Sequence, residues 1–152
     1  MINSTKAWLL LIGLLHLHTG VPAELPNSKI TPGYMRDVSV RELCTTSTSL
    51  VRNVPESLKK DVFSNYGLKG NDRSVCKEGY EIDHLISLEL GGANDAKNLW
   101  PQSYCGSPYN AHIKDKLENE LHRRVCKNEM TLKAAQDCIS SNWTLCYTQI
   151  FK

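Results

Sequence analysis

One short stretch of the chain decides the fold, and it reads Glu81-Ile82-Asp83-His84-Leu85-Ile86-Ser87-Leu88-Glu89-Leu90-Gly91-Gly92. Apolar residues and one histidine occupy every second position, and this period of two predicts a β-strand that ends at the Gly91-Gly92 turn. Residues 98–100 then predict a short returning strand, which Pro101 closes. Together the two segments predict a hairpin.

Helical patterns lie on both sides of this hairpin. A first helix is predicted from Pro55 to a stop at Gly67. Ser107-Pro108 has the form of an N-cap followed by a first helical residue, and a stripe of apolar residues at every fourth position continues that helix to about Cys126. A last helix is predicted from a Thr131 cap toward residue 143, whereas residues 38–53 are expected to hold a short strand or irregular chain.

The N-terminal residues have the composition of an export signal. Lys6 supplies a short positive region, an apolar run follows from Ala7 to Leu17, and Val21-Pro22-Ala23 offers small residues for cleavage. The run is well short of the ~20 residues that span a bilayer. We therefore expect a signal peptide over residues 1–23, a secreted or periplasmic chain, and no stable membrane association after cleavage.

The remaining residues, 24–152, are close to neutral and contain all six cysteines. Loss of Lys6 lowers the formal net charge from +2 to +1, so contact with nucleic acid must come from a local basic patch. No cysteines form the Cys-x-x-Cys pair of zinc ribbons. Export would place the thiols in an oxidising compartment, so three disulfides are expected, with their pairing left open.

The opening stretch combines with two further motifs, Asn98-Leu99-Trp100-Pro101-Gln102 and Asn110-Ala111-His112-Ile113-Lys114-Asp115-Lys116-Leu117-Glu118. In this combination the chain resembles the HNH nuclease family, and more narrowly exported bacterial and phage HNH-like proteins. The resemblance covers residues 81–126, within a core motif at 80–126. It implies a ββα-metal finger, in which a helix packs across a hairpin and one divalent ion is held. The expected fold is therefore a single disulfide-stapled α+β domain over residues 24–152, with this finger as core and helices on its flanks.

The resemblance also implies roles for three residues of the hairpin. The histidine after the acidic residue is the general base of the family, which assigns that role to His84 and metal binding to Asp83. An imidazole titrates at about pH 6.5, so it can be neutral near pH 7 and accept a proton from water. Asn98 corresponds to the asparagine whose side chain holds the loop and orients the histidine.

The helix start supplies the remaining candidates. The third metal ligand is left open between Asn110, which fits the subfamily pattern, and His112, which restores a literal third histidine. Lys114 stands one helical turn after Asn110, where it either faces the phosphate or pairs with Glu118. Further candidate phosphate contacts, chosen by their place in the sequence, are Lys97, Lys116, Arg123 and Arg124.

These residues predict a secreted metal-dependent endonuclease that hydrolyses DNA, with RNA as an alternative substrate. One divalent ion is expected, Mg²⁺ first and Mn²⁺, Ni²⁺ or Zn²⁺ as alternatives. Two rival hypotheses are a catalytically inactive binding or inhibitory module on the same fold, and a structural zinc domain that uses His112 and cysteines. One geometric condition applies: neighbouring strand residues point to opposite faces, so Asp83 and His84 can serve one site only where the strand twists, bulges or ends.

Overall fold

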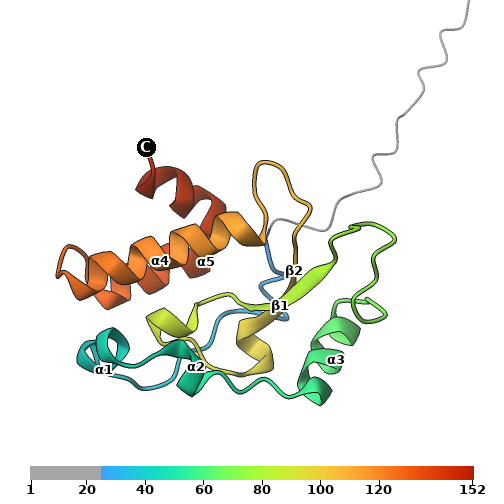
Figure 1. The fold of residues 1–152 in the computed structure, drawn as a ribbon, viewed down its shortest axis with the longest axis horizontal. Helices are drawn as coiled ribbons and strands as arrows, with labels where there is room; N and C mark the ends of the chain where they lie inside the picture. Colours follow the sequence, from blue (N-terminus) through green and yellow to red (C-terminus); the bar gives the residue numbers. More distant parts are fainter. Residues whose placement is uncertain (1–24) are drawn as a thin grey trace, which may run out of the picture.

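The computed structural model describes residues 25–152, so the predicted signal peptide lies outside the described residues. Figure 1 shows a mixed fold in which a two-stranded sheet lies between helices, which confirms the predicted α+β class. No helix within residues 25–152 is long and apolar enough to cross a membrane. The elements in chain order are α1 (Val40–Thr45), α2 (Thr48–Val51), α3 (Glu56–Asn65), β1 (Tyr80–His84), η1 (Leu88–Leu90), η2 (Ala96–Asn98), β2 (Leu99–Ser103), α4 (Ala111–Cys126) and α5 (Leu132–Ile150).

The predicted hairpin is present, but its first strand is shorter than the sequence pattern suggests. β1 and β2 pair antiparallel from Tyr80 opposite Ser103 to His84 opposite Leu99. The apolar residues after His84 do not extend the strand; they lie in a loop and in the 3-10 turn η1, where they are buried in the core. β2 also continues through Pro101, because in a two-stranded sheet each strand keeps an edge where no N–H donor is needed.

The side chain of Asn98 explains why the ladder stops at His84. Its Oδ1 accepts from the Ile86 backbone N–H at 3.0 Å, and its Nδ2 donates to the carbonyls of Ile86 at 2.9 Å and Ala93 at 3.1 Å. The fully buried amide thus satisfies backbone groups that would otherwise lack partners. Gly92 lies against this contact, where a Cβ would stand 1.7 Å from the Ile86 carbonyl oxygen. The Asn98 side chain therefore fixes the start and the middle of the loop between the strands.

The start of α4 differs from its prediction. Ser107-Pro108 does not open the helix; the peptide bond between these residues is cis, and α4 begins at Ala111. Asn110 is the N-cap, since its Oδ1 accepts from the Ile113 backbone N–H at 3.1 Å. The N-cap therefore lies three residues after the predicted Ser107.

Residues 38–53 also differ from their prediction, because they form the short helices α1 and α2. Ser39 accepts from the Glu42 backbone N–H and Ser47 from that of Ser49, so each serine satisfies a donor at a helix start. The helix predicted after Pro55 is confirmed as α3, and Gly67 follows it with φ +71°. The predicted Thr131 cap of α5 is confirmed as well.

The main core lies where α4 and α5 run side by side (Figure 1) and meet the loop between the strands. The predicted apolar stripe of α4 supplies Leu117, Leu121 and Val125, all at most 2% exposed. Three disulfides confirm the expected cross-links, and their pairs are Cys44–Cys126, Cys76–Cys105 and Cys138–Cys146. The first joins α1 to the end of α4, and the second closes the far end of the hairpin.

Substitution of Asn98 by alanine is expected to destabilise the fold by about 3 kcal/mol or more, because three buried backbone groups lose their partner. The free energy of unfolding is measured by urea titration followed by circular dichroism. Asn119→Ala is the matched control, since this exposed amide bonds only to the Asp115 carbonyl, and a change within about 0.5 kcal/mol is expected. Equal effects of the two substitutions would contradict the structural role of Asn98.

Candidate active site at the end of strand β1

Asp83 and His84 lie at the last two positions of β1 and contact different neighbours. Asp83 Oδ2 lies 2.6 Å from Lys114 Nζ on α4, whereas His84 Nε2 lies 3.0 Å from Asn94 Oδ1 in the loop. The ladder is regular through His84, and the strand ends there. The Asp83 charge still raises the pKa of His84 against the effect of burial, so the two side chains remain within electrostatic reach.

Asn94 determines which imidazole nitrogen of His84 carries the proton. The amide Nδ2 of Asn94 donates to the Val51 carbonyl at 2.7 Å, which turns Oδ1 toward the imidazole. Because Oδ1 can only accept, Nε2 must donate. In the neutral ring the lone pair then lies on Nδ1, which is the nitrogen free to accept a proton.

Burial keeps this imidazole neutral. His84 is 2% exposed, and burial lowers its pKa below the ordinary value because charged imidazole is poorly solvated there. Asp83 and the bond to Asn94 oppose that shift, while the positive charges of Arg52 and Lys114 add to it. The result is a neutral base at neutral pH, which is the protonation state that general-base catalysis requires.

Lys114 occupies the centre of the interface between β1 and α4. Its side chain is fully buried, and its ammonium donates to Asp83 Oδ2 at 2.6 Å, to the His84 carbonyl at 2.7 Å and to Glu118. Burial alone would lower the pKa of Lys114, but the charges of Asp83 and Glu118 outweigh burial and raise it above its ordinary value. Of the two alternatives for this residue, the structure places the ammonium with carboxylates and away from the surface.

Four carboxylates surround this single lysine. Asp83 raises the pKa of Glu81, Asp115 and Glu118 by charge repulsion, although burial is the largest cause in each case. The pKa of Glu81 rises to about 7, and Glu81 Oε1 is buried without a hydrogen-bond partner. Oxygen donors with uncompensated negative charge fit a hard divalent ion, so the donor set on this face of β1 suits such an ion.

The two candidates for the third metal ligand lie at the start of α4. Asn110 uses both ends of its amide locally, because Oδ1 caps the helix and Nδ2 donates to the Gly106 carbonyl at 3.1 Å. His112 is exposed and packs its ring against Tyr104, with 5.1 Å between ring centroids. Burial raises the pKa of Asp115 and the charge of His112 opposes that shift, so His112 lies within electrostatic reach of this carboxylate.

Asn98 holds the loop, but its amide does not contact the imidazole. The hydrogen bond that orients His84 comes from Asn94 instead. Asn94 lies in the segment that follows the two glycines, and nothing in the periodicity distinguishes it from an ordinary turn residue. Arg52, whose charge acts on both His84 and Asp115, was likewise missed because it lies in a stretch with no regular pattern.

The basic residues proposed as phosphate contacts are not gathered around His84. Arg123 and Arg124 both bond to Glu120 on the same helix. Lys97 and Lys116 are exposed and lie in η2 and on α4. None of these four charges is among the causes that shift the His84 pKa.

A second cluster, Cys44, His122 and Cys126, has atoms close enough to hold a metal. However, Cys44 and Cys126 form a disulfide, and none of the cysteines within residues 25–152 is free. Zinc binding requires thiolates. The structural zinc domain built on cysteines is therefore wrong, and His122 here contacts the Leu43 carbonyl at 3.2 Å beside the disulfide.

Comparison of the chain with protein-family models, with curated proteins and with solved structures gave no match. The functional interpretation therefore rests on the residues and contacts of this chain.

Substitution of Lys114 by methionine is expected to cost about 3–5 kcal/mol of folding free energy near pH 8, because Asp83 and Glu118 lose their buried counter-charge. Lys114 opposes the burial that raises the pKa of Glu118, and its loss leaves two buried carboxylates without a counter-charge, so the destabilisation should grow as pH rises and shrink near pH 5. Urea unfolding at both pH values measures this. Lys116→Met, at an exposed position, is the control, and a pH-independent loss at position 114 would contradict the electrostatic role.

Substitution of Glu81 by glutamine is expected to stabilise the protein at alkaline pH. The folded pKa of about 7 lies above the ordinary 4.5, so the stability linked to protonated Glu81 is complete below about pH 4.5 and is lost as pH rises through 7. Glutamine stays neutral, and the gain near pH 8 should be about 1–2 kcal/mol after solvent screening. Thermal unfolding with chelator measures it, with exposed Glu78→Gln as control. A gain that is equal at pH 4 and pH 8 would exclude this cause.

Proposed function

We propose that this protein is a secreted metal-dependent endonuclease, in which β1, β2 and α4 form the ββα-metal finger. The observation that carries the proposal is the setting of His84: a buried imidazole whose Nε2 is bonded to Asn94 and whose Nδ1 has no hydrogen-bond partner among residues 25–152, one residue from Asp83. A positioned base of this kind typically supplies ~10²–10⁴ in rate. The substrate is DNA, with RNA as the alternative.

In this proposal His84 Nδ1 accepts the proton of the water that attacks phosphorus. Asn94 holds the ring so that the same nitrogen faces the water in each turnover. Asp83, together with Asn110 or His112, would hold one divalent ion, Mg²⁺ in the first instance, which neutralises charge on the scissile phosphate and on the leaving 3′ oxygen. Cleavage then leaves a 5′-phosphate and a 3′-hydroxyl.

Lys114 has a positioning role in this scheme. Its ammonium binds both the Asp83 carboxylate and the His84 carbonyl. One cation therefore positions the Asp83 side chain, the proposed metal ligand, relative to the backbone of His84, the proposed base. The second oxygen of Asp83 is left for the ion. A lysine that contacted the phosphate would have to leave two carboxylates, which makes the phosphate role the less favoured of the two alternatives.

Two features support export as part of this function. The N-terminal composition is that of a signal peptide, and all six cysteines are paired in disulfides, which persist in oxidising compartments. A nuclease that acts outside the cytoplasm must stay folded there. The two disulfides that bracket the hairpin and α4 meet that requirement.

Plasmid digestion by the refolded mature protein tests the proposal. We expect nicking with Mg²⁺ or Mn²⁺, no nicking with chelator, and a loss of at least ~10²-fold in His84→Ala. Asn94→Ala should lose less, because its imidazole remains but is no longer oriented. Asn119→Ala, on the exposed side of α4, serves as the control. If wild type and His84→Ala nick equally, or no divalent ion supports nicking, the protein is not a nuclease and the inactive binding module becomes the better hypothesis.

A further inference from the structure

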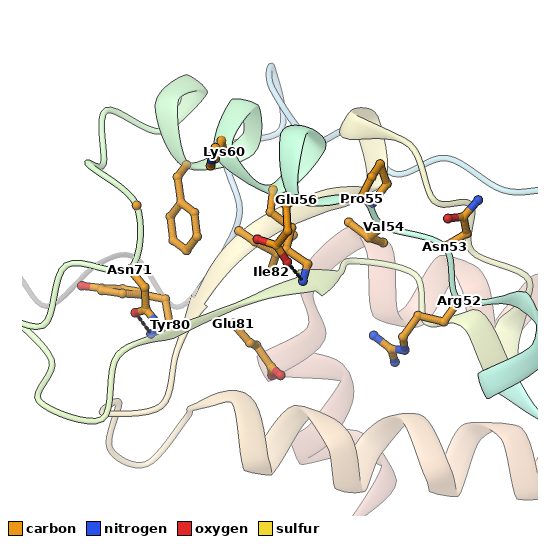
Figure 2. Close-up of a pocket in the computed structure, with 13 residues that line it drawn as sticks. Arg52, Asn53, Val54, Pro55, Glu56, Lys60, Asn71, Tyr80, Glu81 and Ile82 are labelled. Atoms are coloured by element: carbon orange, nitrogen blue, oxygen red, sulfur yellow. Dashed lines mark hydrogen bonds and ion pairs between the residues drawn. The ribbon is translucent and has the colours of Figure 1, made fainter.

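A groove of about 790 Å³ lies between α3 and β1, on the side of the sheet opposite α4. Figure 2 shows Tyr80 and Ile82 directed toward α3, whereas Glu81 points away toward α4. The groove contains apolar surface from Val54, Phe63 and Ile82 and three basic side chains near its rim. Its lining residues are Arg52, Asn53, Val54, Pro55, Glu56, Lys59, Lys60, Phe63, Gly70, Asn71, Tyr80, Glu81 and Ile82.

The groove lies on the same side of β1 as His84. Side chains two residues apart on a strand share a face, so Tyr80, Ile82 and His84 lie along the same side of β1. The groove covers the first two of these positions, and the imidazole follows at the end of the strand. A chain molecule lying in the groove would therefore pass the proposed base.

Arg52 lies at the end of the groove nearest to His84. The Val51 carbonyl accepts the hydrogen bond from Asn94 that orients the imidazole, so the residue after Val51 is held beside the same loop. Arg52 itself lines the groove, so its side chain is available to a ligand at this end. Its exposed guanidinium forms no hydrogen bond or ion pair with the described residues.

The two lysines of the groove continue this positive charge along α3. Lys60 is exposed and has no ion pair with the residues that the structure describes, whereas Lys59 pairs with Glu56 at 2.6 Å. Arg52 and Lys60 are therefore the cations most available to a ligand. Cations along the rim of a partly apolar groove suit a strand whose phosphates lie outward and whose bases lie inward.

We propose that this groove binds a single strand of nucleic acid beside the scissile phosphate, with Arg52 on the phosphate next to His84 and Lys60 on a phosphate further along. The inference rests on the proposed function and specifies its substrate. The groove has the volume of a site for a small ligand, about 300–1,000 Å³, which accommodates part of one strand. The amide of Asn53 at its edge can bond to a base, whereas Asn71 Oδ1 already accepts from the Tyr80 backbone N–H at 2.8 Å.

Binding is tested apart from catalysis, with His84→Ala protein, chelator and fluorescein-labelled oligothymidylate or oligouridylate. Fluorescence anisotropy gives the dissociation constant between about 50 and 200 mM salt. Each phosphate contact on a single strand contributes about 0.7 to the slope of log affinity against log salt. Arg52→Gln with Lys60→Gln should therefore reduce the slope by about 1.4 and weaken binding about tenfold or more at low salt. Lys127→Gln with Lys152→Gln, which removes the same charge at exposed positions outside the groove, should change neither.

Three outcomes would overturn the inference: no binding of either oligonucleotide, equal effects of the two double variants, or tighter binding of the matching duplex with the same dependence on Arg52 and Lys60. Circular dichroism shows that each variant is folded. Failure of the proposed function is recognised separately: if the wild-type protein binds through the groove but cleaves neither plasmid nor the single-stranded oligonucleotide with any divalent ion, it keeps the binding site and lacks the catalysis.

Discussion

The buried ammonium of Lys114 is the interaction on which the rest of the site depends. It binds the side chain of Asp83, the backbone of His84 and the side chain of Glu118, and thereby joins the end of β1 to the first turns of α4. An unpaired charge at this depth would be very costly. The helix can therefore pack against the hairpin only in a position where the lysine meets its carboxylates, which fixes the geometry of the proposed finger.

Two asparagines complete this arrangement on the other side of the strand. The Asn98 side chain bonds to the Ile86 backbone, where strand pairing has stopped after His84, and so holds the loop. Asn94 lies in that loop and bonds to both the imidazole and the last residue of α2. One chain of hydrogen bonds thus connects α2 to His84. It also explains why Arg52, far from the hairpin in sequence, lies beside the imidazole.

The two faces of β1 differ in charge, and the proposed reaction uses both. Glu81 and Asp83 face α4 among carboxylates that exceed the one buried lysine, which favours a cation there. Tyr80 and Ile82 face the groove with Arg52, Lys59 and Lys60, which favours a polyanion. The faces meet where the strand ends at His84, so the proposed ion, base and substrate would come together only because the ladder stops at that residue.

The sequence alone determined the hairpin, α3, the apolar stripe of α4 and the presence of three disulfides, because period-two and period-four burial and export chemistry are local properties. It also singled out Asp83, His84 and Asn98. The tertiary structure decided the length of β1, since Asn98 ends the ladder from fourteen residues away. It also decided the partner of His84, the enclosure of Lys114 and the place of Arg52. These depend on which backbone and side-chain groups meet after folding, and no periodicity along the chain encodes such contacts.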